Sequence, residues 1–274
     1  GGLFSLTNTG ASLSKANSAT ANFDEFAISP NGRQIAAVGH PNNNYEIYLM
    51  NVDGTGIKRI TQTTGNGADH DPSFSPDGER LVFTRSSSAP IGKVSQEDIY
   101  TVDIRSKKLK RLTNDKAGES NPAFSPSGKQ IAFSKSLTHG RGGTDIYTMS
   151  PNGRQVHRLT RYSGYDAYPS YSPNGKTIVF ASDRGSGMGQ AIFTMSASGT
   201  NQRLLVKNRN SDEDAINPSF SPDGKKVVFS LANQFDENWK TVLRVFTLRT
   251  RKQVTVGPAT TTNLNPSWSV AISN

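Results

Sequence analysis

The stretch Phe74-Ser75-Pro76-Asp77-Gly78 decides the fold of this chain, because close copies of it recur along the whole sequence. The other full copies read Ile28-Ser29-Pro30-Asn31-Gly32, Phe124-Ser125-Pro126-Ser127-Gly128, Tyr171-Ser172-Pro173-Asn174-Gly175 and Phe220-Ser221-Pro222-Asp223-Gly224, and a truncated copy reads Trp268-Ser269. The prolines at positions 30, 76, 126, 173 and 222 set a spacing of 46 to 50 residues. A fixed period in this range indicates an array or a propeller of repeated units.

Each repeat contains four short strand patterns separated by turn residues. In the repeat at 69–113, runs rich in branched and aromatic residues predict strands at 72–75, 79–84, 98–102 and 110–113. Four antiparallel strands make one propeller blade. At the N-terminus, the patterns of a third and a fourth strand fall at residues 3–6 and 12–14. At the C-terminus, the patterns of a first and a second strand fall at residues 265–269 and 270–272. We therefore predict an all-β, six-bladed β-propeller of four-stranded antiparallel blades, one domain over 1–274, whose sixth blade is closed by both termini.

Composition excludes several classes of protein. There is no cysteine, so neither disulfides nor thiolate metal sites can form. No apolar run is long enough to span a bilayer, and no signal peptide is recognisable. The net charge of +9 is spread over all repeats, and its densest cluster, residues 107–111, has no aromatic partners. This pattern favours a soluble basic surface over a nucleic-acid site. We expect the protein to be a monomer.

The repeats resemble those of the TolB-like (WD40-like) β-propeller family over essentially the full chain. The resemblance rests on the Phe-Ser-Pro-Asp-Gly phrase, on strands such as Asp145-Ile146-Tyr147-Thr148-Met149, on the Asp53-Gly54-Thr55 turn and on strands such as Lys110-Arg111-Leu112-Thr113. It covers only the propeller half of TolB, whose α/β N-terminal domain has no counterpart here. The resemblance implies a bacterial cell envelope, with a periplasmic or secreted location. The same repeat is similar to the propellers of dipeptidyl peptidases and of oligogalacturonate lyases.

Functional residues are expected on the face that carries the fourth-to-first and second-to-third connections, because these loops vary in length. Alternation along the innermost strands places a polar column toward the central channel. Its members are Glu25, Asp69, Asp71, Glu119, Asn121, Asp166, Tyr168, Asn217, Asn263 and Asn265. One interpretation is a hydrated channel whose polar side chains cap turns and bind water. The other is a site for a cation or a basic peptide, in which Asp69, Asp71 and Asp166 would hold Ca²⁺.

Other candidate residues share this face. His40, His70 and His139 lie in its loops, but His139 is about two blades away from the others, so isolated surface histidines are favoured over a lyase-like metal site. No nucleophile elbow is present. The aromatic loop residues Tyr162, Tyr165, Tyr168, Phe235 and Trp239 either anchor a partner or pack loops onto blades.

The sequence therefore predicts a non-enzymatic scaffold that binds a protein or peptide over the channel mouth. We expect no cofactor, with Ca²⁺ in the channel as the exception. A carbohydrate-active or metal-assisted lyase or hydrolase on the same face is the alternative, and it would require a convergent cluster of acids, bases or metal ligands.

Overall fold

The computed structural model describes residues 3–5, 14–16, 23–40, 44–65, 67–87, 96–136, 142–184, 189–207, 213–233 and 241–260. These residues contain 22 strands, which pair into five four-stranded sheets and one two-stranded sheet. Within each sheet, neighbouring strands are antiparallel and follow one another in sequence. Each four-stranded sheet is one blade, as the four strand patterns of each repeat predict.

The strand bounds follow the repeats closely. The first blade contains β3 (Phe23–Ile28), β4 (Gln34–Gly39), β5 (Glu46–Asn51) and β6 (Lys58–Arg59). The second contains β7 (Ala68–Phe74), β8 (Arg80–Ser86), β9 (Glu97–Asp103) and β10 (Leu109–Arg111). The third contains β11 (Glu119–Phe124), β12 (Ile131–Ser136), β13 (Thr144–Met149) and β14 (His157–Arg158). The fourth contains β15 (Asp166–Tyr171), β16 (Thr177–Ser182), β17 (Ala191–Ser196) and β18 (Arg203–Val206). The fifth contains β19 (Glu213–Phe220), β20 (Lys226–Asn233), β21 (Thr241–Thr247) and β22 (Lys252–Thr260).

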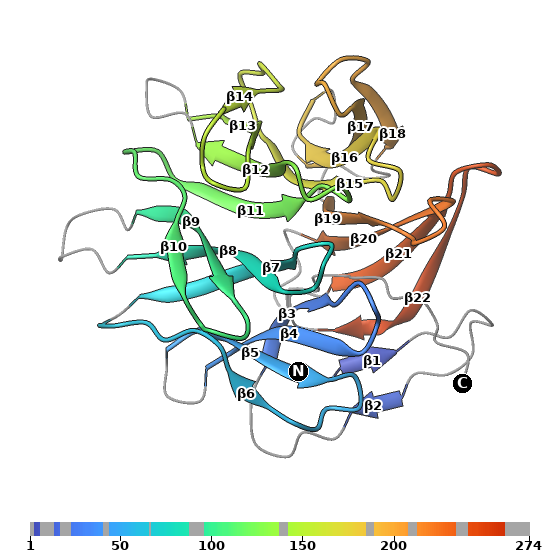
Figure 1. Cartoon of the computed structure of the whole chain (residues 1–274). Helices are drawn as coiled ribbons and strands as arrows, with labels where there is room; N and C mark the ends of the chain where they lie inside the picture. The colour runs from blue at the N-terminus through green and yellow to red at the C-terminus, as the bar shows by residue number, and fades with distance from the viewer. Residues whose placement is uncertain are drawn as a thin grey trace.

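The blades are arranged around a centre lined by their first strands (Figure 1). Contacts between blades run in the order β3, β7, β11, β15 and β19. The apolar cores lie between neighbouring blades, so that Ala27 and Ile47 of the first blade pack with Phe74 and Phe83 of the second. The largest side chains of these cores are fully buried phenylalanines from the second strand of four blades: Phe83, Phe133, Phe180 and Phe229.

The Ser-Pro-x-Gly phrase forms the turn between the first and second strands of each blade. In the second blade, the amide of Gly78 donates to the carbonyl of Ser75 at 2.8 Å, with a φ of 73° at the glycine. Ser75 Oγ accepts a hydrogen bond of 2.9 Å from the amide of Arg80. The turn also packs on the previous blade, since a Cβ on Gly78 would lie 3.9 Å from Cδ of Pro30. The phrase recurs because it serves the same structural purpose in each blade.

The prediction of six blades was wrong, because the described residues form five. The N-terminal strands predicted for a sixth blade are present, but as a separate two-stranded sheet of β1 (Leu3–Ser5) and β2 (Ser14–Ala16). The C-terminal strands predicted at 265–272 lie outside the described residues. In sequence, the last copy, Trp268-Ser269, lacks the Pro-x-Gly turn that joins the first and second strands of every other repeat, so the sequence signal for a sixth hairpin was weaker than for the other five.

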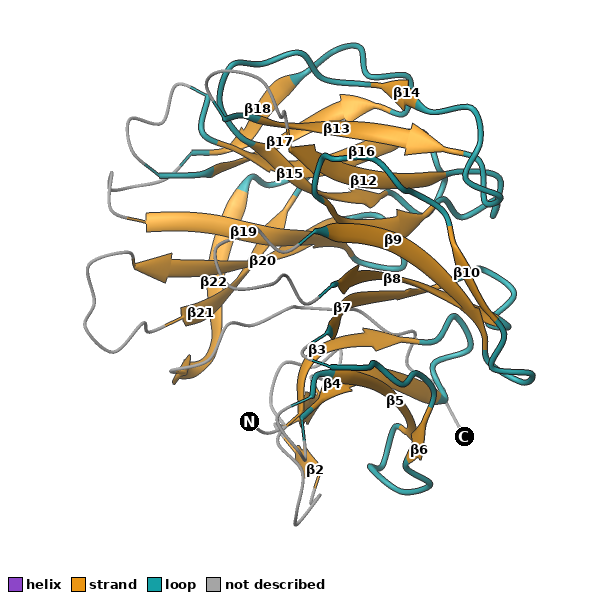
Figure 2. Ribbon diagram, turned by 90° about the vertical axis from the view of Figure 1, so that its left-hand side faces the viewer, coloured by secondary structure: helices purple, strands orange, loops and turns teal. Residues whose placement is uncertain are grey.

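The strands run between two faces of the molecule, and connections gather at both (Figure 2). One face carries the Ser-Pro-x-Gly turns and the third-to-fourth turns; we call it the turn face. The opposite face carries the other connections; we call it the loop face. In the part of the chain that the structure describes, no helix is long and apolar enough to cross a membrane.

Candidate functional site

Each first strand contains one non-glycine residue with a left-handed backbone, and these five residues surround the channel. They are Glu25, Asp71, Asn121, Tyr168 and Asn217, with φ values between 49° and 55°. At each one the pairing with the second strand shifts register, as in a β-bulge. Such conformations cost about 1–3 kcal/mol each and persist only where the surroundings enforce them. All five belong to the polar column predicted from the sequence.

Hydrogen bonds between these residues connect the first four blades in turn. The amide of Asp71 donates to Glu25 Oε2 at 2.6 Å, and the amide of Asn121 donates to Asp71 Oδ2 at 3.2 Å. Ser134 Oγ donates to Asn121 Oδ1 and accepts from the amide of Tyr168, both at 3.2 Å. The bulges therefore aim the amides of Asp71, Asn121 and Tyr168 at side chains of the preceding blades, so the channel wall is also an inter-blade connection.

Two carboxylates of neighbouring blades are held together in this wall. Burial, followed by the nearby charge of Glu25, raises the pKa of Asp71 to about 6, although Thr84 Oγ1 donates to Asp71 Oδ2 at 3.0 Å. Burial also raises the pKa of Glu97 at the start of β9. A cluster of carboxylates therefore lies at the channel of a protein with a net charge of +9.

A stack of rings lies beside these carboxylates at the loop face. The ring of Tyr45 is 4.9 Å from that of His40 and 5.3 Å from that of His70, centroid to centroid. His70 Nδ1 lies 3.3 Å from Glu25 Oε1. Burial opposes a charge on His70, but the hydrogen bond and charge of Glu25, with the charges of Asp71 and Glu97, raise its pKa. The Tyr45 side chain, missed by the sequence analysis, is exposed and could contact a partner.

Two tyrosines of the fourth blade complete the mouth. The rings of Tyr165 and Tyr168 lie 6.4 Å apart. Burial raises the pKa of Tyr165, and the charges of Asp71 and Glu97 act in the same direction. We call Glu25, His70, Asp71, Glu97, Tyr165 and Tyr168 together the acidic mouth.

A cavity of about 250 Å³ continues from the bulge residues toward the turn face. Asp71, Asn121, Tyr168 and Asn217 line it, together with prolines that follow them in their strands. Asp71 and Tyr168 therefore belong both to the acidic mouth and to the lining of this cavity.

Two acids of the predicted column are buried and paired with bases rather than facing the channel. Asp69 accepts two hydrogen bonds from Arg85, from Nε at 2.6 Å and from Nη2 at 2.8 Å. Glu119 Oε1 lies 2.8 Å from Lys135 Nζ. Burial raises the pKa of Glu119 to about 7, although Lys135 acts in the opposite direction.

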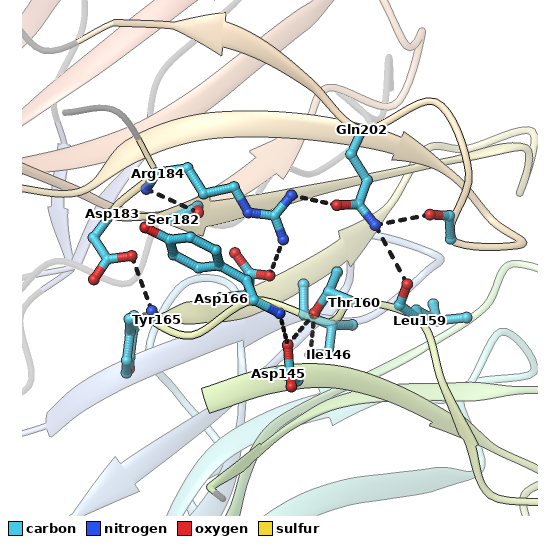
Figure 3. Close-up of polar contacts among 12 residues, drawn as sticks. Asp145, Ile146, Leu159, Thr160, Tyr165, Asp166, Ser182, Asp183, Arg184 and Gln202 are labelled. Carbon is cyan, nitrogen blue, oxygen red and sulfur yellow. Dashed lines mark hydrogen bonds and ion pairs between the residues drawn. The ribbon is translucent and has the colours of Figure 1, made fainter. Parts of the chain in front are cut away.

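The third such acid, Asp166, is fully buried and forms an ion pair with Arg184 (Figure 3). The guanidinium of Arg184 also contacts Gln202 and lies 4.9 Å from the ring of Tyr162. In the neighbouring blade, Asp145 accepts a hydrogen bond of 2.9 Å from Thr160 Oγ1. The amide of Tyr162 donates to Asp145 Oδ1 at 3.1 Å, so the Arg184–Tyr162 contact connects the fourth blade to the third.

The bulge explains the difference between the predicted and observed columns. Beyond Asp71 the alternation of the strand is inverted, so that His70 pairs with Thr84 and Asp69 with Arg85 across the hairpin. A strictly alternating strand would place Asp69 and Asp71 on the same face. The sequence signal for these pairs is a basic residue at or just after the end of the second strand: Arg85, Lys135 and Arg184.

The remaining candidates are placed as follows. Asn263, Asn265, Phe235, Trp239 and His139 lie outside the described residues. Among the residues that are described, no three His, Asp or Glu side chains are placed to hold a metal ion together. Ca²⁺ binding by Asp69, Asp71 and Asp166 stays a prediction.

Comparisons with known proteins agree with this architecture. The model of the family described as "Tricorn protease N-terminal beta propeller domain" matches residues 87–269, more than half of the chain. A search of the curated proteins gave no match.

Several solved structures are similar. TolB from Acinetobacter baumannii matches with 25% identity and a TM-score of 0.73, over 96% of this chain and 61% of that one. A putative TolB from Agrobacterium tumefaciens matches with 20% identity and a TM-score of 0.74, over 94% of this chain and 89% of that one. An oligogalacturonate lyase from Vibrio parahaemolyticus matches with 12% identity and a TM-score of 0.60, over 87% of this chain and 67% of that one. The last two likenesses concern the fold alone. The resemblance to TolB-like propellers is confirmed, and the chain spans 61% of the length of the Acinetobacter protein.

Proposed function

Because the chain belongs to the family of the Tricorn protease N-terminal beta propeller domain, we propose that it is a non-enzymatic scaffold that binds a protein or peptide partner at the acidic mouth. The observation that carries the proposal is the pair of carboxylates, Glu25 and Asp71, held close together at the channel. A carboxylate whose pKa is raised to about 6 is costly to keep charged at neutral pH. A cationic partner group would offset that cost by adding positive charge to that of His70, which lies 3.3 Å from Glu25.

The chemistry of the mouth favours a basic segment of the partner. Glu25, Asp71 and Glu97 supply negative charge, whereas the chain as a whole is basic. A lysine or arginine side chain would therefore be attracted to the mouth and repelled by much of the remaining surface. Tyr45 and Tyr165 add flat aromatic surfaces of the kind enriched where binding energy concentrates.

The setting that we propose is extracytoplasmic, in the periplasm or secreted, with the chain acting as a monomer. The similarity to TolB structures and the repeat resemblance support this location.

A binding assay with defined peptides tests the proposal. We would measure the fluorescence anisotropy of labelled lysine–glycine and glutamate–glycine peptides with chelator-treated protein. The double variant Glu25→Gln/Asp71→Asn removes two charges from the mouth. Its matched control, Asp53→Asn/Asp103→Asn, removes two charges outside the mouth, one in the exposed third-to-fourth turn of the first blade and one at the end of β9.

We expect the lysine peptide to bind, and the mouth variant to weaken that binding by roughly tenfold or more. The control variant should bind like the wild type. Equal losses in both double variants would show that only net charge matters, and the proposal would then fail.

A further inference from the structure

A second cavity, of about 560 Å³, lies far from the acidic mouth, in the wedge between the second and third blades. Its walls come from the outer strands β9 and β10, the start of β8, and the turn at Pro151 and Asn152 in the third blade. The cavity opens at the turn face. Its chemistry is opposite to that of the mouth.

Two cross-strand rows on one face of the second blade supply the cations. Arg80 pairs with Asp103 across β8 and β9, and the amide of Asp103 donates to the carbonyl of Lys108 at 3.1 Å. In the next row, Thr101 pairs with Lys110. Since residues two apart on a strand share a face, Arg80, Lys108 and Lys110 are directed to the same wall.

The third blade closes the wedge. Lys110 Nζ donates to the carbonyl of Asn152 at 3.1 Å, across the cavity edge. The guanidinium of Arg80 lies over the ring of Phe124 in β11, 5.7 Å from its centroid. A Cβ on Gly153, which has a φ of 84°, would lie 2.6 Å from the carbonyl oxygen of Leu112. The turn therefore fits against the second blade only because it has glycine there.

The acids near these cations offset only part of their charge. Asp77 Oδ2 lies 3.6 Å from Arg80 Nη2, and Asp103 pairs with Arg80 across β8 and β9. Asp103 Oδ1 accepts from the amide and the hydroxyl of Ser106, at 2.7 and 2.6 Å. These two hydrogen bonds lower the pKa of Asp103. With three bases in the lining against Asp103 and the neighbouring Asp77, the site keeps a net positive charge.

The repeats provide an internal comparison, because each blade has positions equivalent to Arg80 and Lys110. The equivalent pairs are Gln34 and Lys58, Gln130 and His157, Thr177 and Arg203, and Lys226 and Val254. Of the five blades described, only the second has a lysine or arginine at both positions. The repeat architecture therefore does not require this concentration of charge.

We propose that the wedge cavity binds a small molecule or a head group that carries a phosphate beside hydroxyl groups. An arginine fork and two lysines match the geometry and charge of a phosphate. Thr101, Ser106 and the Asn152 backbone provide polar partners for hydroxyl groups, and Leu109 and Pro151 provide apolar contact. The volume lies in the range of small-molecule sites. The site is separate from the proposed peptide site, so either can fail without the other.

Calorimetric titration at low ionic strength tests the proposal, with glucose 6-phosphate, inorganic phosphate and glucose as probes. The test variant is Lys108→Gln/Lys110→Gln. The matched control is Lys58→Gln/Lys225→Gln, which removes two other exposed charges. We expect glucose 6-phosphate to bind more tightly than either other probe, and the test variant to weaken this binding by roughly tenfold or more. An unchanged affinity in the test variant, or equal binding of glucose, would overturn the proposal.

Vesicle sedimentation distinguishes the two sources of the phosphate. Binding of glucose 6-phosphate without sedimentation on phosphatidylglycerol vesicles would assign a free ligand. Sedimentation on phosphatidylglycerol but not phosphatidylcholine, lost in the test variant and kept in the control, would assign a lipid head group. If neither probe binds, or if the control loses sedimentation equally, the proposal is refuted.

Discussion

Replacing Asp71 by asparagine should make the protein more stable at alkaline pH, which is unusual for a buried polar residue. The carboxylate accepts hydrogen bonds from Thr84 Oγ1 and from the amide of Asn121 on a single oxygen, Oδ2. An asparagine retains an oxygen that can accept both. It removes the negative charge that burial and Glu25 disfavour.

The magnitude follows from the pKa of about 6 in the folded protein, compared with the ordinary value of 3.8. A carboxyl group with a raised pKa binds its proton more tightly when folded, so it favours the folded state at acidic pH. That contribution is present below the unfolded pKa and is lost as the pH rises through 6. At about 1.4 kcal/mol per pH unit, the change amounts to about 3 kcal/mol of unfolding free energy.

Urea denaturation of the wild type and of Asp71→Asn at pH 8 and at pH 4.5 measures this difference. We expect the variant to be more stable than the wild type by up to about 3 kcal/mol at pH 8, with most of the difference gone at pH 4.5. Asp53→Asn is the control, because hydrogen bonds from Thr55 lower the pKa of Asp53, and its loss should decrease stability at pH 8. A destabilised Asp71→Asn variant, or a difference that is the same at both pH values, would refute this reasoning.

Three other substitutions test the packing. Asp69→Ala should lower the unfolding free energy by about 1–3 kcal/mol in urea denaturation, because it removes the buried carboxylate that pairs with the half-buried guanidinium of Arg85; an unchanged unfolding free energy would contradict this role of the pair. Gly153→Ala should lower thermal stability by about 1–3 kcal/mol because of its positive φ and the Leu112 carbonyl, whereas Gly142→Ala, whose Cβ would meet no atom within 4 Å, should not. Phe133→Ala removes a fully buried side chain and should lower the unfolding free energy measured by calorimetry by about 3–5 kcal/mol. A loss as small as that of a surface substitution would show that Phe133 does not lie in the core between blades.

Stability and function should therefore diverge at Asp71. The charge on Asp71 destabilises the fold, although a single substitution would remove it. Such charges are expected at binding sites, where activity and stability are often opposed. The same Asp71→Asn change is expected to weaken binding of a basic peptide. Observation of both effects together would be difficult to explain if Asp71 had only a structural role.

Much of the fold could be predicted because its signals are local and repeated. The turn at Ser75, Pro76 and Gly78 specifies a hairpin through its own backbone and side-chain hydrogen bonds, and every full copy does the same. The number of blades could not be predicted with the same rule. The fragment Trp268-Ser269 has the apolar residue and serine of the phrase but lacks its turn, so counting it as a blade overestimated the number.

The channel residues were predicted only as far as the bulge. Asp71 and Asn121 lie in the wall, and each sits at the bulge of its strand. Asp69 belongs to the second pairing beyond the bulge, after His70, and is placed against Arg85 instead. A left-handed backbone at a non-glycine residue has no sequence signal of its own in a single chain, because tertiary contacts impose it.

The most direct test of the account is hydrogen–deuterium exchange with and without the lysine–glycine peptide. Proposed binding at the acidic mouth predicts slower exchange in segments of β7, β11 and β15 that contain Asp71, Asn121 and Tyr168, and unchanged exchange in β10 at the outer edge. Protection confined to the outer strands, or no protection at a saturating peptide concentration, would contradict the claim that this propeller binds its partner at the channel.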